Sequence, residues 1–457
     1  MEPSKDSNTN KAAEDLAKVT LEEEDDDETV EQPIDNEPTA TKTAEEVGLE
    51  VETKDNELLS KDQTWDTLGV RPEIKEALFD MNFNSPSKIQ STTFPLIMKT
   101  PVSHLIAQAK NGAGKTGAFG LGVISRLDET SNTIQAIIFA HTLELVNQIE
   151  TVLAKMAKKT KLKVTALHSS DKNKEAGHIV IITPGHFDTC FLKKKQYKLD
   201  QVKMIVFDEA DYMFTNEVTL QVAEKTLKQC QDKDYKIQYL FFSATFTKDN
   251  FKTIKKYIKK ANIIEIQKEQ LTLTNVHQRY YKVDKREDKV NFIKEYLSRV
   301  TDKERVIIFV NSRKFVVNLR EKLIKEGYKV FILMGGDMDP QNRIETIKRF
   351  NKGEIQILIT TNVLARGYDE RLINLVINFD MPVKIVNNKK VADVENYLHR
   401  IGRTGRFGDK GVALNLIAGE KDMLTLKQVE EYYKTKMEEI KSLDQLFEEM
   451  KKYLFDD

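Results

Sequence analysis

The chain has 457 residues, with 71 basic side chains, 72 acidic side chains and only two cysteines, Cys190 and Cys230. This length predicts about two to three domains, and two cysteines exclude a secreted scaffold held together by disulfides. No apolar run reaches about 18 residues, and the N-terminus lacks the basic and apolar regions of a signal peptide, so we expect neither a membrane span nor secretion.

The net charge of −1 conceals an acidic beginning and a basic remainder. Residues 1–60 hold 20 of the acidic and 5 of the basic side chains, a net charge of −15, which leaves +14 on the rest. The same residues lack aromatics, which predicts a disordered acidic tail that either inhibits the basic body or only keeps the chain soluble. The basic body favours a polyanionic partner, although lysines that merely solubilise a helical surface would explain the charge equally well.

From Trp65 onward, short apolar runs alternate with helix-length amphipathic segments. The first series of runs lies at 104–108, 135–140, 163–167, 178–183, 204–208, 239–244 and 262–266. The second series lies at 305–310, 330–333, 356–361, 375–380 and 412–417. Continuous Val, Ile and Phe runs between helices predict parallel strands that are buried on both faces. We therefore predict an α/β fold with two tandem domains, over 61–267 and 277–457, joined by a linker at 268–276.

A phosphate-binding turn is the strongest local signal. The segment AKNGAGKT at 109–116 follows the first apolar run and precedes a predicted helix, with Ala109 where the general P-loop pattern has glycine. Glycines allow a tight turn whose N–H groups bind phosphate, a lysine reaches the phosphate, and a threonine hydroxyl binds Mg²⁺. This context favours a nucleotide site over a merely structural turn. The residues expected at the nucleotide are Gly112, Ala113, Gly114, Lys115 and Thr116.

Two acidic residues, Asp208 and Glu209, begin the tetrapeptide DEAD at the end of the run 204–208. A carboxylate at the carboxyl end of a parallel strand near a P-loop is placed to hold hydrated Mg²⁺. Asp208 suits that role, partly through water, and Glu209 can deprotonate the attacking water. An acidic helix start is the alternative for the tetrapeptide alone.

The segment HRIGRTGR at 399–406 carries arginines in the second predicted domain. Phosphoryl transfer builds charge on the γ-phosphate, and arginine from another domain stabilises it. We expect Arg403 and Arg406 to complete the ATP site when the domains close, whereas a solvated basic turn is the alternative. Three weaker signals fit this plan: the hydroxyls of Ser243 and Thr245, the polar loop at 361–369, and the Gln90 amide, which can pair with adenine.

Together these motifs resemble the DEAD-box RNA helicases of superfamily 2 over about residues 64–455. The segments SPSKIQ, AKNGAGKT, TPG, DEAD, SAT, TTNVLARGYD and HRIGRTGR occur in the family's order. The resemblance implies two RecA-like domains that use ATP and Mg²⁺ and bind single-stranded RNA across both domains. It also implies that Gln90 reads adenine beside Trp65, that Asp369 contacts the ribose, and that Ser243 and Thr245 couple hydrolysis to RNA remodelling. The RNA contacts it implies are Thr183, Gly185, Arg343 and Thr361.

Three longer segments resemble the branch of the family that acts in mRNA export at the nuclear pore. They are PVSHLIAQAKNGAGKT, MPVKIVNNKKVADVENYLHRIGR at 381–403 and KSLDQLFEEM at 441–450. The resemblance implies a nuclear-pore protein and an inositol-phosphate-dependent activator as partners, in cytoplasm and nucleus and including the cytoplasmic face of the pore. Nothing in the sequence demands more than a monomer. A translation-initiation helicase is the competing member type.

The chain departs from the family in the RNA-binding motifs of its first domain. Leu143 stands where an arginine is expected, and the Gly-Gly pair expected before Thr183 is absent. A lost phosphate contact weakens RNA binding and lowers its salt dependence. These departures leave open a low-turnover, ATP-dependent RNA clamp, and a DNA-directed motor is a less favoured third hypothesis.

Overall fold

The computed structural model describes residues 50–51, 63–109, 112–171, 174–265, 275–301, 304–334, 338–362, 373–386, 389–405 and 410–455. Nearly all of the predicted acidic tail and most of the predicted linker lie outside the described residues, as do Asp369 and Arg406. Two residues of the predicted tail, Glu50–Val51, form the short strand β1, which pairs in parallel with β8.

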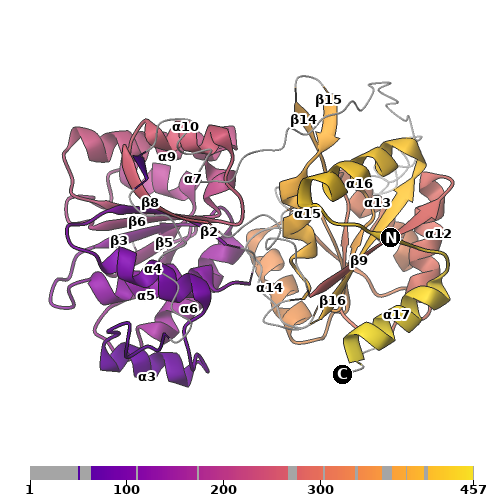
Figure 1. Cartoon of the computed structure of the whole chain (residues 1–457), viewed down its shortest axis with the longest axis horizontal. Helices are drawn as coiled ribbons and strands as arrows, with labels where there is room; N and C mark the ends of the chain where they lie inside the picture. The colour runs from indigo at the N-terminus through magenta and orange to yellow at the C-terminus, as the bar shows by residue number, and fades with distance from the viewer. Residues whose placement is uncertain are drawn as a thin grey trace, which may run out of the picture.

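Two parallel sheets, one in each half of the chain, form the framework of the molecule (Figure 1). The first sheet has the order β1-β8-β2-β7-β6-β3-β5-β4, and the second has the order β11-β12-β10-β13-β16-β9-β17. The strands of the first sheet after β1 are β2 (His104–Gln108), β3 (Ala136–Phe139), β4 (Val164–Leu167), β5 (Ile179–Ile182), β6 (Met204–Asp208), β7 (Gln238–Ser243) and β8 (Lys260–Glu265). Those of the second are β9 (Val276–Val283), β10 (Val306–Phe309), β11 (Phe331–Leu333), β12 (Ile357–Thr360), β13 (Leu375–Asn378), β16 (Gly411–Ala418) and β17 (Glu438–Ile440).

Helices cover both faces of each sheet (Figure 1). The first half contains α3 (Pro72–Asp80), α4 (Lys88–Met98), α5 (Lys115–Arg126), α6 (Leu143–Met156), α7 (Pro184–Phe187), the π-helix η2 (Asp188–Lys193), α8 (Ala210–Met213), α9 (Glu217–Asp232) and α10 (Lys248–Lys255). The second contains α12 (Arg286–Leu297), α13 (Arg313–Lys325), α14 (Pro340–Asn351), α15 (Val394–Ile401), α16 (Gly419–Tyr433) and α17 (Leu443–Phe455). No described helix combines the length and apolarity that crossing a bilayer requires.

The apolar runs are continuous because both sides of each strand are buried. On β6, Met204 and Val206 join the core beneath α4, α5 and α6, whereas Ile205 and Phe207 join the core beneath α9 and α10. Side chains of successive strand residues point to opposite faces, so a strand covered on both faces requires an unbroken apolar run. The α/β fold with two tandem parallel sheets is therefore confirmed. The exact domain boundaries remain a prediction.

Candidate active site

The predicted phosphate-binding turn lies between β2 and α5. Gly112 and Gly114 have φ values of 74° and 95°, a left-handed backbone that glycine adopts without steric cost. Gly114 is the N-cap of α5, so the N-terminus of a 12-residue helix follows the turn directly. Lys115, the first residue of α5, is buried, and its Nζ donates to the Ala109 carbonyl at 2.9 Å. The Lys115 ammonium group therefore lies at the turn between β2 and α5, next to the N-terminus of α5.

Gln90 lies against this turn and is held there by a hydrogen bond. Its Oε1 accepts a hydrogen bond from the Ser87 N–H at 2.8 Å, and a Cβ added to Gly117 would lie 2.5 Å from its Nε2. The Ser87 hydroxyl also donates to the Ala113 carbonyl at 2.9 Å. The segment before α4 and the start of α5 therefore form one surface, on which a side chain at position 117 would displace the Gln90 amide.

Trp65, the aromatic residue predicted to lie near the base, is buried, whereas the Phe83 ring lies near the start of α5. The Trp65 side chain is only 2% exposed in the first core, and its indole N–H donates to the Phe83 carbonyl at 2.8 Å. The Phe83 ring is half-buried and lies 3.9 Å from the position of a Cβ on Gly117. The burial of Trp65 favours a core residue that positions Phe83 over direct contact with a base. The sequence could have indicated Phe83 as well, because this aromatic residue lies seven positions before Gln90.

Asp208 and Glu209 form a buried pair of carboxylates at the carboxyl end of β6. Both side chains are 4% exposed, and the Glu209 N–H donates to Asp208 Oδ1 at 3.1 Å. Burial, reinforced by the neighbouring Glu209 carboxylate, raises the pKa of Asp208 to about 7, and Lys115 opposes this shift. Glu209 is the N-cap of α8 in a left-handed conformation, with φ of 51°, which is uncommon for a residue other than glycine. Two desolvated carboxylates offer oxygen donors of the kind that Mg²⁺ prefers.

A chain of polar contacts leads from this site to the second half of the molecule. The Ser243 hydroxyl accepts a hydrogen bond from the Thr245 N–H at 3.1 Å, and the Thr245 hydroxyl donates to Asp211 Oδ2 at 2.8 Å. The same Asp211 oxygen lies 3.6 Å from Nε2 of His399, which is fully buried on α15. No role is predicted for Asp211 or His399 from the sequence, although Asp211 ends the motif DEAD and His399 begins HRIGRTGR. Only the fold brings them together.

The arginines of the second half have two different surroundings. Arg403, 2% exposed, follows α15, and its Nε donates to the His399 carbonyl at 3.0 Å. Arg400 is fully buried, and its guanidinium donates to the side chains of Asn311 and Asn362 and to the Asp380 carbonyl. Burial lowers the pKa of Arg400 to about 10. Arg400 therefore stabilises the loops after three strands, whereas Arg403 lies beside the residue that faces the first half.

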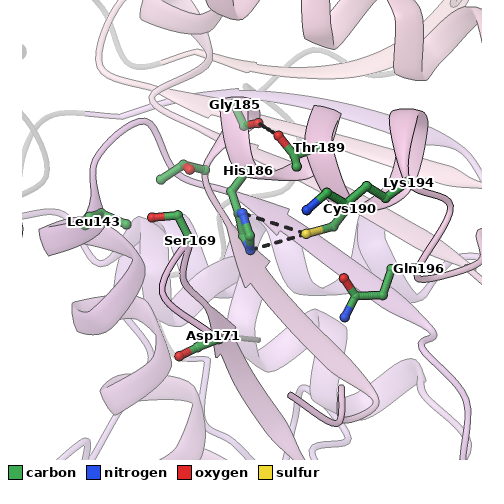
Figure 2. A pocket seen from close by; sticks show the side chains of 10 residues that line it. Leu143, Ser169, Asp171, Gly185, His186, Thr189, Cys190, Lys194 and Gln196 are labelled. Carbon is green, nitrogen blue, oxygen red and sulfur yellow. Dashed lines mark hydrogen bonds between the residues drawn. The ribbon is translucent and has the colours of Figure 1, made fainter. Parts of the chain in front are cut away.

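The predicted RNA-binding residues of the first half line an open pocket of about 630 Å³ (Figure 2). Thr183, the N-cap of α7, and Gly185 line it together with Leu143 at the start of α6. Lys194 and Gln196 line the opposite part, and His186 Nε2 lies 3.4 Å from Cys190 Sγ. The residue that departs from the family pattern thus faces the residues expected to contact RNA.

The two predicted RNA-binding residues of the second half lie on different elements. Thr361 follows β12 and is 8% exposed. Arg343 on α14 reaches the first half, where its Nε lies 3.0 Å from Glu144 Oε1, next to Leu143. Both side chains of this ion pair are largely buried, so it holds α6 and α14 together.

Two family models match the chain. The model described as DEAD/DEAH box helicase matches residues 87–254, and the helicase conserved C-terminal domain matches residues 288–408. DEAD-box ATP-dependent RNA helicase 38 of Oryza sativa is 36% identical over 83% of this chain and 76% of its own length. ATP-dependent RNA helicase DBP5 of Phaeosphaeria nodorum is 35% identical over 90% and 87%, and DDX19A of Bos taurus is 34% identical over 84% and 79%.

Solved structures of related proteins have the same fold. Dbp5 of S. cerevisiae bound to RNA and ADP BeF3 matches with a TM-score of 0.80 and 32% identity, covering 86% of this chain and 100% of that chain. Mss116p bound to ssRNA and AMP-PNP matches with a TM-score of 0.74 and 25% identity, covering 87% and 84%. These matches confirm the two tandem RecA-like domains predicted from the sequence.

The chain belongs to the DEAD/DEAH box helicases and is an ATP-dependent RNA helicase, an enzyme whose ATP hydrolysis depends on RNA. Within this family it is similar to DBP5 and DDX19A, which confirms the predicted resemblance to the mRNA-export branch.

Proposed function

We propose that this helicase remodels RNA or RNA–protein complexes during mRNA export at the cytoplasmic face of the nuclear pore, in cells where it occurs in both cytoplasm and nucleus. The similarity to DBP5 and DDX19A carries this proposal. Two solved structures of S. cerevisiae Dbp5, 33% and 32% identical to this chain, hold Gle1 with IP6, and Nup159 with Gle1, IP6 and ADP. By analogy, a nuclear-pore protein and an inositol-phosphate-dependent activator are the partners of a monomeric helicase.

The nucleotide site binds ATP between the two halves. The turn of Gly112, Ala113 and Gly114 supplies N–H donors for phosphate, and Lys115 leaves the Ala109 carbonyl to contact the β- and γ-phosphates. Gln90 reads the adenine edge, with the Phe83 ring beside it. Thr116 and Asp208, the latter partly through water, would hold Mg²⁺, which would supply positive charge against the phosphates. Glu209 accepts a proton from the attacking water.

Closure of the two halves couples ATP hydrolysis to RNA binding. Arg403 and Arg406 stabilise charge on the γ-phosphate, and Asp369 binds the ribose from the second domain. The contacts from Ser243 through Thr245 and Asp211 to His399 connect the hydrolytic site with the segment that carries the arginines. Because ATP and RNA both favour the closed state, each strengthens the binding of the other.

RNA binds along Thr183 and Gly185 in the first domain and along Arg343 and Thr361 in the second. These residues offer mostly hydroxyl, backbone and guanidinium groups, which contact the sugar–phosphate backbone and do not read sequence. Arg343 is ion-paired with Glu144, so this pair also joins the two domains on the RNA side.

The first prediction concerns the pH dependence of Mg²⁺ binding. Asp208 must lose its proton to hold the metal, and its raised pKa of about 7 places that loss near neutral pH. We expect the affinity for MgADP to rise as the pH increases through 7 and to fall by up to about tenfold per pH unit below it. Titrations of a fluorescent ADP analogue from pH 5.5 to 8.5, with Mg²⁺ and with EDTA, measure this dependence. If Asp208→Asn keeps the same pH profile, the assignment to Asp208 is wrong.

The second prediction concerns the departure at Leu143. Arginine at this position would add a cation beside Thr183 and Gly185, so Leu143→Arg should strengthen single-stranded RNA binding about fivefold at 0.1 M salt and steepen the salt dependence by about 0.7. Fluorescence anisotropy at several salt concentrations with a non-hydrolysable ATP analogue measures both quantities. Leu143→Met is the uncharged control. An RNA affinity unchanged by the arginine would mean that the strand does not pass this pocket.

Depletion of the protein in its own cells tests the export function. Nuclear accumulation of polyadenylated RNA is the expected result, and it should be reversed by the unchanged chain but not by a Glu209→Gln version. Normal export with a loss of protein synthesis would instead favour the translation-initiation type. Export restored by the Glu209→Gln version would favour the RNA clamp, which needs ATP binding without turnover.

A further inference from the structure

A small antiparallel hairpin projects from the second domain between β13 and α15 (Figure 1). Its strands β14 (Val383–Val386) and β15 (Lys389–Ala392) form a two-stranded sheet of their own. The base of the hairpin is fixed, because the Ala392 N–H donates to Gln428 Oε1 on α16 at 2.8 Å and the Ala392 side chain is buried. All four residues of β14 are exposed.

This strand presents apolar side chains to solvent. Ile385 is 71% exposed, Val386 43% and Val383 37%. Only eight large hydrophobic residues in the described part of the chain are exposed to this degree, and three of them lie on β14. The remaining five are spread over three helices and one loop. Scattered apolar residues are ordinary on a protein surface, whereas a contiguous group marks a site of contact. A hairpin of two strands also gains little stability on its own, so its exposed β-branched residues call for a covering partner.

The outer edge of β14 is open for pairing. Helix α16 contacts β15, and no strand among the described residues pairs with β14 on its other side. An open edge with unpaired N–H and C=O groups accepts an additional strand, and a bound extended peptide uses these groups for affinity. Val383 and Ile385 lie on one face of β14 and Val386 lies on the other. The side chains of an added strand would therefore lie beside exposed apolar groups on both faces.

The charge of the hairpin identifies the chemistry of its partner. Lys384, Lys389 and Lys390 give residues 383–392 a net charge of +3 without any acidic residue. In the hairpin register Ile385 lies opposite Lys390 and Val386 opposite Lys389, so each of these two apolar side chains has a cation next to it, whereas Val383 lies opposite Ala392. Lysines would also attract RNA, but the segment has no aromatic residue and no arginine for stacking on bases, and RNA would leave the aliphatic side chains uncovered.

We propose that β14 is a docking strand for an extended acidic segment of another protein. The partner segment adds as a third strand along β14, its β-branched or other apolar side chains cover Val383, Ile385 and Val386, and its carboxylates face the three lysines. This surface lies outside the ATP and RNA sites, so it links the helicase to a partner without occupying either site.

The test uses the full chain and a fluorescein-labelled synthetic peptide of eight residues in which aspartate and glutamate alternate with valine and isoleucine. We expect the peptide to bind, to protect the amides of 383–386 from hydrogen exchange, and to bind at least tenfold more weakly when Ile385 and Val386 are both replaced by threonine. The double variant should keep the RNA-stimulated ATPase of the unchanged chain, because it touches neither site. Val218→Thr is the matched control. Val218 lies on α9 and is 70% exposed, close to the 71% of Ile385.

Three results would overturn the proposal. Equal binding of a polyglutamate of the same length would show that charge alone attracts the peptide. Binding unaffected by Ile385→Thr with Val386→Thr would place the peptide elsewhere, and the exchange pattern would locate that place without any variant. Displacement of the peptide by single-stranded RNA, with RNA affinity lost when Lys384, Lys389 and Lys390 become glutamine, would make the hairpin an RNA contact instead.

Discussion

A Glu209→Gln protein is expected to bind ATP and RNA but to hydrolyse ATP at least about a hundredfold more slowly than the unchanged chain, because glutamine cannot accept the proton of the attacking water. Glu209 is buried beside Asp208, and glutamine has the same shape as glutamate, so the substitution removes the charge with little change in volume. Phosphate release with and without single-stranded RNA measures the rate, and anisotropy with a fluorescent ATP analogue measures nucleotide affinity.

Glu224→Gln provides a control for the loss of one carboxylate in the same domain. Glu224 lies on α9 and pairs with Lys256 at 3.1 Å, away from the phosphate-binding turn. Its replacement should leave both the rate and the affinity unchanged. If Glu209→Gln retained half of the normal rate, another group would have to act as the base, and the role proposed for Glu209 would be wrong.

Replacement of Arg403 by alanine should reduce RNA-stimulated turnover by about a thousandfold or more, the range in which arginine fingers act, with little change in ATP affinity. The guanidinium is buried, and its bond to the His399 carbonyl holds it beside the contact between the two halves. Single-turnover hydrolysis at saturating RNA measures the chemical step separately from product release. Arg403→Lys should recover only a small part of the rate, because lysine keeps the charge without the fork of donors.

Arg400 distinguishes loss of chemistry from loss of structure. Because its buried guanidinium satisfies Asn311, Asn362 and the Asp380 carbonyl, Arg400→Ala would leave several buried polar groups without partners and should lower the melting temperature strongly. Arg403→Ala removes the donor to one carbonyl, that of His399, and should lower the melting temperature less than Arg400→Ala does. Turnover that survives in a folded Arg403→Ala protein would contradict the finger assignment.

The sequence predicts those features that are encoded locally. The phosphate-binding turn is readable because strand, turn and helix follow one another in 104–126, and the glycines match the left-handed positions at 112 and 114. The parallel sheets can be predicted because each strand is buried on both faces, and such a strand requires a continuous apolar run in the sequence. Asp208 and Glu209 are readable because they end such a run.

Contacts between distant segments could not be predicted in this way. Asp211 and Thr245 meet because they follow the neighbouring strands β6 and β7, and His399 reaches Asp211 only because the two halves face each other. The same holds for the ion pair of Glu144 with Arg343. Trp65 is a comparable case, since an aromatic near a nucleotide-binding segment fits direct contact and core packing equally well, and only its 2% exposure favours the core.

The two sheets share no strand, so the chain could be cut between them into two fragments. In the described chain, strands β1 to β8 pair only with one another. Strands β9 to β13, β16 and β17 form the second sheet, in which β9 lies between β16 and β17. A cut between β8 and β9 would therefore sever no sheet hydrogen bond. The two fragments, made as separate polypeptides, would carry complementary parts of one catalytic centre. The two fragments would then associate only when ATP and RNA are both present, so their association could be used to detect the two ligands together.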